Sequence, residues 1–167
     1  TGPFHPRGPG DTASRRRLLA PLAGLGPDAD EAARIQAVLT PLLRRAYRRP
    51  VTEADFTGPL RQFREGRAEG DFDLGLERAV AAVLVSPHFL FRIERDPPGL
   101  PAGSVRALGD FELASRLSFF LWSSVPDDAL LDTAAGGGLR DAAVLEREVR
   151  RMLADPRADN LVTNFAA

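Results

Sequence analysis

Two aromatic-rich stretches, each with charged residues inside an apolar run, most constrain the fold of this chain. The first is SPHFLFRIE, from Ser86 to Glu94, and the second is DFELASRLSFFLWSSVPDDALL, from Asp110 to Leu131. Burying a charged group costs free energy unless an opposite charge pairs with it. We therefore expect both stretches to lie in a packed helical core that contains internal ion pairs.

Four charged residues of these stretches are the candidate buried ion-pair residues. Glu112 precedes Arg116 by one helical turn, the favourable order for a pair on one helix face, and Phe119 shares that face. Arg92 and Glu94 point to different sides of a helix, so each needs its own partner. One open pairing joins Arg92 to Glu112. The other joins Glu94 to Arg116, and either would connect the two stretches.

Helical periodicity and capping residues predict an all-α fold, since no segment alternates like a strand over a useful length. Asp30, Asp71 and Asp141 each precede an apolar stripe at helical spacing and are typical N-caps. Thr52 and Asp55 fit a capping box. We expect six or seven helices, at about residues 30–48, 52–65, 71–86, 110–123, 126–135, 141–153 and from 155 onward.

Glycine, proline and capping patterns predict further local details. Gly66 and Gly70 bracket an expected turn. The following AVAAVLV run is apolar on every side, which indicates a central, buried helix. Ser86-Pro87 should kink or restart that helix. Asp110 is the expected N-cap of the helix in the second aromatic stretch.

The predicted helices form an irregular bundle in two packed modules. Residues 1–29 are rich in Pro and Gly and are expected to be an extended linker or the tail of a preceding domain. The first helical module spans residues 30–95, a linker spans 96–109 and the second module spans 110–167. The last residues still follow a helical pattern, so we expect this module to be truncated at its C-terminus.

Composition excludes several kinds of function. The 22 basic residues, all arginine, and 23 acidic residues give a net charge of −1, which disfavours nucleic-acid binding. The absence of cysteine removes disulfides, thiolate catalysis and covalent c-type haem attachment from this chain. The longest apolar run, Ala79 to Val85, is far shorter than the ~20 residues that span a bilayer. His5 and His88 cannot make a three-histidine zinc site, so we expect no metal or cofactor in this chain.

Carboxylates supply the remaining candidate chemistry. A hydrolase would need two of them facing a common cleft, one as acid and one as base. If all of them lie in ion pairs or helix caps, that function fails. The candidates are Glu94, Glu112, Asp127 and Asp128.

The serine and arginine clusters have simpler structural interpretations. Ser123-Ser124 before Pro126 suggests a nucleophile beside acids, but the spacing fits a serine N-cap and a first-turn proline better. AYRRP, from Ala46 to Pro50, is interpreted as a solvent-facing basic rim at a helix C-terminus, where positive charge suits the helix dipole.

Four segments resemble a known pair of adjacent domains: RRAYRRPVTEADF (44–56), LVSPHFLFRIE (84–94), FELASRLSFFLWSSVPDD (111–128) and RRMLADPRADNLVTNFA (150–166). These are domains of unknown function from large exported bacterial proteins of the planctomycete cytochrome-c-associated type. The resemblance covers roughly residues 30–167. It implies an exported, periplasmic or extracellular, multidomain protein whose other domains are the partners, including a cytochrome c domain that carries the haem c. No catalytic residue is carried over, because none is established for these domains.

Two functions remain open. The first is a helical scaffold or interaction module of an exported cytochrome-c-linked protein, with no catalytic centre within this chain. The alternative is a carboxylate-based extracellular hydrolase domain.

Overall fold

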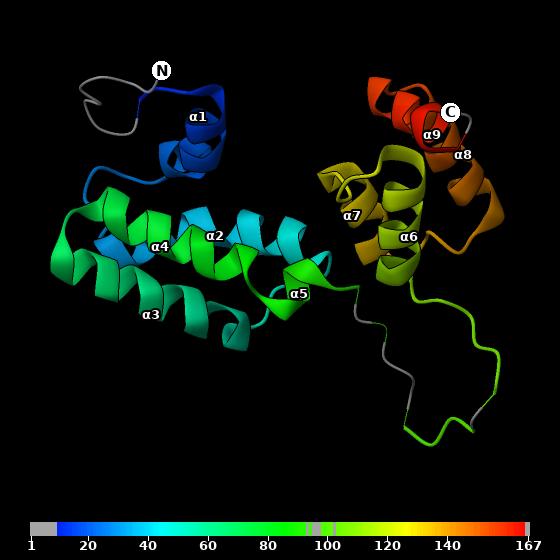
Figure 1. Cartoon of the computed structure of the whole chain (residues 1–167), viewed down its shortest axis with the longest axis horizontal. Helices are drawn as coiled ribbons and strands as arrows, with labels where there is room; N and C mark the ends of the chain where they lie inside the picture. The colour runs from blue at the N-terminus through cyan, green and yellow to red at the C-terminus, as the bar shows by residue number, and fades with distance from the viewer. Residues whose placement is uncertain (1–9, 93, 95–97, 102, 166–167) are drawn as a thin grey trace. The chain divides into compact units, whose positions relative to one another are not determined.

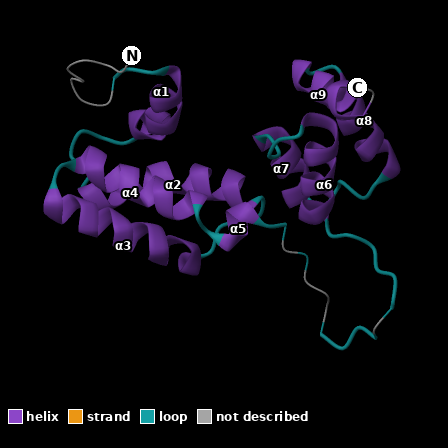
Figure 2. Ribbon diagram, in the orientation of Figure 1, coloured by secondary structure: helices purple, strands orange, loops and turns teal. Residues whose placement is uncertain are grey.

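A computed structural model gives the fold of the chain (Figure 1) and describes residues 10–92, 94, 98–101 and 103–165. These residues form helices and loops and contain no strand (Figure 2), which confirms the all-α prediction. The described residues form nine α-helices and two 3-10 helices: α1 Ala13–Leu19, η1 Ala20–Gly24, α2 Glu31–Tyr47, α3 Glu53–Glu69, α4 Phe72–Leu84, α5 Pro87–Leu90, α6 Asp110–Trp122, α7 Asp128–Ala135, α8 Ala142–Leu153, η2 Pro156–Ala158 and α9 Asp159–Phe165.

The prediction of six or seven helices was too low because it missed α1 and did not count α5 as a separate helix. α1 lies in the segment that we expected to be an extended linker, of which residues 1–9 are outside the described residues. Thr12 caps α1 by accepting a hydrogen bond from the Arg15 backbone N–H at 3.1 Å. The Arg15 guanidinium binds Asp73 on α4 at 2.7 Å. α5 is the restart expected at Ser86-Pro87.

The predicted caps start most of the helices. Asp30, Asp71 and Asp141 each accept backbone N–H groups from the first turn of the following helix, at 2.7 to 3.1 Å. The capping box also forms, with Asp55 Oδ2 2.7 Å from the Thr52 backbone nitrogen. Such caps satisfy N–H groups that a helix start leaves unpaired. These starts are therefore encoded locally.

Two caps around α6 and α7 differ from the prediction. Asp110 is the first residue of α6 rather than its cap, and its carboxylate accepts from the Leu139 backbone N–H at 2.8 Å. Ser123 ends α6 in a left-handed conformation (φ 51°), and Asp127 caps α7 in place of a serine. Asp110 therefore binds a backbone N–H outside its own helix, and the N-cap of α7 is an acidic residue rather than a serine.

The chain divides into two compact units, each described here by itself. The first contains the described residues up to Leu43 and from Val51 to Ser86, and the second contains those from Arg44 to Pro50 and from Pro87 onward. In the first unit, α3 and α4 lie side by side (Figure 1). The buried apolar residues of this unit are Ile35, Val38, Leu39, Leu43, Phe56, Phe63, Leu76, Ala79 and Val83.

Close packing of α3 on α4 explains why Gly66 does not make the predicted turn. A Cβ atom at Gly66 would lie 2.8 Å from the Gly75 Cα atom on α4, so only glycine allows this approach. α3 therefore continues through Gly66 and ends at Gly70. α4 buries one face rather than all of its surface: Ala79 is fully buried, whereas Leu84 at its end is 44% exposed.

The second unit has its own core around Trp122. This side chain is fully buried and donates its indole N–H to the Met152 carbonyl at 2.9 Å. A buried indole needs such an acceptor. The other buried residues of this core come from α6, α7, α8 and the turn before α8: Ala114, Leu121, Leu130, Ala134, Leu139 and Met152. Among the described helices, none is both long enough and apolar enough to cross a bilayer.

Replacing Gly66 tests the close helix contact in the first unit. Gly66→Ala should destabilise the chain by about 2 kcal/mol, because the added methyl must push α4 away. The matched control is Gly58→Ala in the same helix, where a Cβ atom meets nothing within 4 Å. It should stabilise the chain by about 0.5–1 kcal/mol through helix propensity. Thermal unfolding followed by circular dichroism measures both, and equal shifts would contradict the contact.

Candidate binding site

Arg48 is the most unusual residue of the second unit. It follows the end of α2, has a left-handed backbone (φ 57°) and is only 6% exposed. Its Nη1 donates to the carbonyls of Ala46 and Phe89 at 2.8 and 3.2 Å. Its Nη2 donates to those of His88 and Phe91, both at 2.8 Å. A helix as short as α5 leaves its carbonyls unpaired, and Arg48 supplies their donors.

The charge of Arg48 has no carboxylate partner among the described residues. Its guanidinium is satisfied by carbonyl dipoles alone. Burial, and then repulsion from Arg92, lowers the pKa of Arg48 below its ordinary value. An arginine stays protonated in a protein even so. The second unit therefore holds a buried positive charge that carbonyl oxygens stabilise and that no described carboxylate pairs with.

Phe119 on α6 lies beside both of these cations. The guanidinium carbons of Arg48 and Arg92 are 5.8 and 6.0 Å from the centre of its ring. Cations are attracted to an aromatic face at this range. Tyr47, at the end of α2, similarly packs its ring 5.2 Å from that of His88 on α5. The end of α2, α5 and α6 are thus joined by arginine and aromatic contacts.

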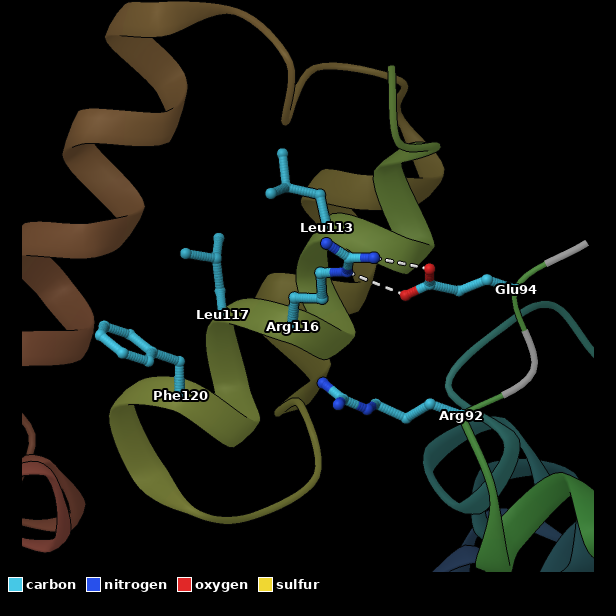
Figure 3. A pocket seen from close by; sticks show the side chains of 6 residues that line it. All are labelled: Arg92, Glu94, Leu113, Arg116, Leu117 and Phe120. Atoms are coloured by element: carbon cyan, nitrogen blue, oxygen red, sulfur yellow. Dashed lines mark hydrogen bonds and ion pairs between the residues drawn. The ribbon is translucent and has the colours of Figure 1, made fainter. Parts of the chain in front are cut away.

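A cleft of about 480 Å³ opens beside these residues in the second unit, which we call the aromatic cleft. Its lining consists of Arg48, Phe89, Leu90, Phe91, Arg92, Arg116, Phe119 and Phe120. A groove of about 790 Å³ adjoins it and shares Arg92, Arg116 and Phe120. In Figure 3, Arg92 extends toward α6 from the same segment as Glu94, and the apolar side chains of α6 complete the groove.

The structure joins Glu94 to Arg116, one of the two pairings left open by the sequence. The contact is bidentate, with Nε–Oε1 and Nη2–Oε2 distances of 2.8 and 2.6 Å (Figure 3). The Arg116 side chain is 50% exposed and that of Glu94 31%, so the pair is half-exposed rather than buried. The hydrogen bond from Arg116 lowers the pKa of Glu94. Both residues lie in the second unit, so the pair links two segments of one unit.

Glu112 does not pair with Arg116 on its own helix or with Arg92. Its two carboxylate oxygens accept from Arg106 at 2.7 and 2.8 Å, and one also accepts from the Gly109 backbone N–H at 2.8 Å. These contacts cap the start of α6. The hydrogen bond from Arg106 lowers the pKa of Glu112. Arg106 outcompetes Arg116 because it approaches both carboxylate oxygens at once, the strong geometry for this pair.

The basic run at the end of α2 does not form the predicted solvent-facing rim. Arg44 binds Asp132, and Arg45 makes a two-pronged contact with Asp128, both on α7. The hydrogen bond from Arg45 lowers the pKa of Asp128. Helix-dipole reasoning alone missed these contacts because the acidic partners lie far along the chain.

Asp127 is held by two arginines beside the Trp122 core. Arg151 binds both of its oxygens at 2.8 and 3.1 Å, and Arg157 approaches at 3.4 Å. Burial opposes ionisation of Asp127, but the hydrogen bonds from Arg151 and the Leu130 backbone N–H, together with the charges of Arg151 and Arg157, outweigh it and lower the pKa of Asp127. Arg157 also stacks 3.5 Å from the centre of the Trp122 ring and binds Asp155 at 2.8 and 2.9 Å.

Sequence reasoning missed Arg48, and no pattern marks it. Apolar periodicity identifies buried positions only within a helix, whereas Arg48 lies just past the end of α2. Its partners are backbone carbonyls, which leave no trace in residue identity. The described residues also contain no group of three or more histidine and acidic side chains that could hold a metal ion.

Truncating Arg48 tests its role in the second unit. Arg48→Met keeps an apolar stem but leaves four carbonyls, all buried or part-buried, without their donor, so the free energy of unfolding should fall by about 3 kcal/mol. Arg48→Lys should lie between Met and wild type, because an ammonium group cannot reproduce the fork. Denaturant unfolding followed by fluorescence of Trp122, the single tryptophan, reports on this unit.

Arg147→Met is the control for that series. Its side chain is 65% exposed and lies 3.8 Å from Glu148, so its loss should change stability by less than about 0.5 kcal/mol. Equal effects of the two methionine variants would contradict the assigned role of Arg48.

Asp155 makes part of the stability of the second unit dependent on acid. The hydrogen bonds from the Arg157 side chain and backbone lower the pKa of Asp155 to about 2, from 3.8. A lowered carboxyl pKa contributes stability above the unfolded-state value, and this contribution is lost as the pH falls toward the folded-state value. When the pH is lowered from 4 to 2, the melting temperature of Asp155→Asn should therefore fall less than that of wild type. An unchanged slope would contradict this linkage.

Comparison with known proteins finds family matches for two segments of the chain. Residues 34–94 match the family described as PSD5, a protein of unknown function (DUF1595). Residues 108–167 match the family described as PSD4, a protein of unknown function (DUF1592). No curated protein and no solved structure is significantly similar to the chain. The chain therefore contains two adjacent domains of unknown function, DUF1595 followed by DUF1592.

Proposed function

We propose that this chain is a non-catalytic helical interaction module of an exported, multidomain polypeptide that also carries a cytochrome c domain. In this proposal the helices form an irregular bundle of two packed modules, and the haem c is held by the other domain. The partners are the other domains of the same polypeptide. The resemblance of the four quoted segments supports the export and the cytochrome link.

The observation that carries the proposal is the state of the four candidate catalytic carboxylates. Each accepts hydrogen bonds from arginine, and Glu112 and Asp127 also bind the backbone at helix starts. The pKa of all four is lowered. A glycosidase-type general acid needs the opposite, a raised pKa that keeps its proton at neutral pH.

A carboxylate bound at both oxygens is also a poor general base. Glu94 and Asp128 each present both oxygens to one guanidinium. Removing a proton from water there would require breaking that contact first. The hydrolase alternative is therefore disfavoured at the residues on which it rested.

The aromatic cleft supports binding instead. Phe91 and Phe120 both line this cleft and are 63% and 55% exposed, which is unusual for large aromatic side chains. Exposed apolar groups rimmed by charge are typical of interaction sites. The cleft is therefore the surface that we assign to partner binding.

The first experiment uses the native full-length polypeptide isolated from its source cells. Its absorbance spectrum, oxidised and reduced, should show c-type haem. A photo-reactive phenylalanine analogue at Phe91 should then cross-link to another domain of that polypeptide on illumination. The same analogue at Val162, which is 65% exposed and outside the cleft, should cross-link far less.

Two results would overturn the proposal. A spectrum without haem would remove the cytochrome link. Hydrolysis of a polysaccharide panel that disappears in Glu94→Gln would replace the binding module by an enzyme.

A further inference from the structure

Arg92 makes no ion pair with a described residue, and Glu94, which attracts it, has both carboxylate oxygens bound by Arg116. The Arg92 guanidinium makes a cation–π contact with Phe119, but it donates no hydrogen bond to the residues that the structure describes. Arg92 is an exposed residue, and its side chain lines the aromatic cleft. Of the cleft cations, it is therefore the one most open to a bound anion.

The buried charge of Arg48 reinforces that of Arg92. The two cations lie 5.8 and 6.0 Å from the centre of the same Phe119 ring and repel each other, and this repulsion adds to burial in lowering the pKa of Arg48. An anion on Arg92 would offset this repulsion. Because Arg48 is held by carbonyls, it acts through its field and keeps its own hydrogen bonds.

The adjoining contact shows which anion chemistry fits. Arg116 already holds a carboxylate, that of Glu94, in a two-pronged contact open to solvent. The cleft and groove together present three guanidinium groups and this single carboxylate, a formal excess of two positive charges. Arginine forks match planar carboxylates.

The exposed apolar side chains favour a peptide over a free anion. Leu90, Phe91 and Phe120 are 59%, 63% and 55% exposed and line the same cleft as Arg92. An inorganic anion would leave this surface in water. A peptide that alternates acidic and apolar side chains would cover it while its carboxylates neutralise the excess charge.

We propose that the aromatic cleft binds an acidic segment of a partner polypeptide, with a carboxylate on Arg92 and an apolar side chain against Phe91 and Phe120. This inference rests on the proposed interaction role and names the chemistry of its partner. The near-neutral net charge of the chain disfavours nucleic acid as the occupant, since phosphate binding requires an extended basic surface. The excess here amounts to three guanidinium groups against one carboxylate in the cleft and its adjoining groove.

The test uses the full chain and a fluorescein-labelled peptide that alternates glutamate with phenylalanine, followed by fluorescence anisotropy at low salt. Arg92→Gln should weaken binding about tenfold. Arg147→Gln, an exposed arginine on α8 outside the cleft, should leave it unchanged. Phe91→Ala and Phe120→Ala should also weaken binding, whereas Val162→Ala should not. Circular dichroism of each variant checks that it is folded.

Each contrary result overturns the inference in a distinct way. Equal binding by Arg92→Gln and Arg147→Gln would remove Arg92 from the site. Equal binding of a peptide with glutamine in place of glutamate would remove the carboxylate. Competition by inorganic phosphate, with no effect of Phe91→Ala, would indicate a free-anion site. Tighter binding of a single-stranded oligonucleotide than of the peptide would indicate nucleic acid.

The peptide test and the cross-linking experiment fail independently. A Phe91 cross-link to another domain without peptide binding would reject the acidic partner and keep the interaction role. If neither the Phe91 cross-link nor peptide binding is observed, the interaction role is rejected as well.

Discussion

The hydrogen bonds from the Arg48 guanidinium to backbone carbonyls are the interaction on which the candidate site depends. They anchor the segment from His88 to Phe91 to the end of α2, and Arg92 follows directly. A guanidinium suits this position because it presents donors in a rigid plane. The left-handed backbone of Arg48 costs about 1 kcal/mol or more, which the carbonyl contacts must outweigh. Together with the Tyr47–His88 ring contact and the Glu94–Arg116 pair, these carbonyl contacts hold α5 and Arg92 beside α6 and Phe119.

The charges of the second unit separate into two classes. Glu94, Glu112, Asp127 and Asp128 each bind arginine, and these pairs organise helix starts and turns. Arg48 and Arg92 have no such partner among the described residues. The near-zero net charge of the whole chain therefore conceals a local excess beside exposed aromatic rings. Pairing of the carboxylates disfavours catalysis and the unpaired cations favour binding, so both observations lead to the same functional class.

Local features of the fold could be predicted from the sequence, and tertiary ones could not. Asp30, Asp71 and Asp141 start their helices as expected because a cap and its partners lie within one turn. Gly66 was misread as a turn because only the approach of α4 explains a glycine there. Glu112 was assigned to Arg116 by helical spacing, whereas Arg106, from the preceding loop, reaches both of its oxygens. Arg48 could not be found because three of its four partners are backbone carbonyls 40 to 43 residues further along the chain.

The aromatic cleft also does not follow the boundary between the two sequence families. Arg48, Phe91 and Arg92 lie within the DUF1595 match, whereas Arg116, Phe119 and Phe120 lie within the DUF1592 match. The structural division agrees with the cleft, since the end of α2 and the segment from Pro87 belong to the same unit as α6. Neither matched segment alone contains the cations together with the rings beside them. In the proposed interaction role, the binding unit is the pair of domains, because a fragment cut at the family boundary would lose part of the lining of the cleft.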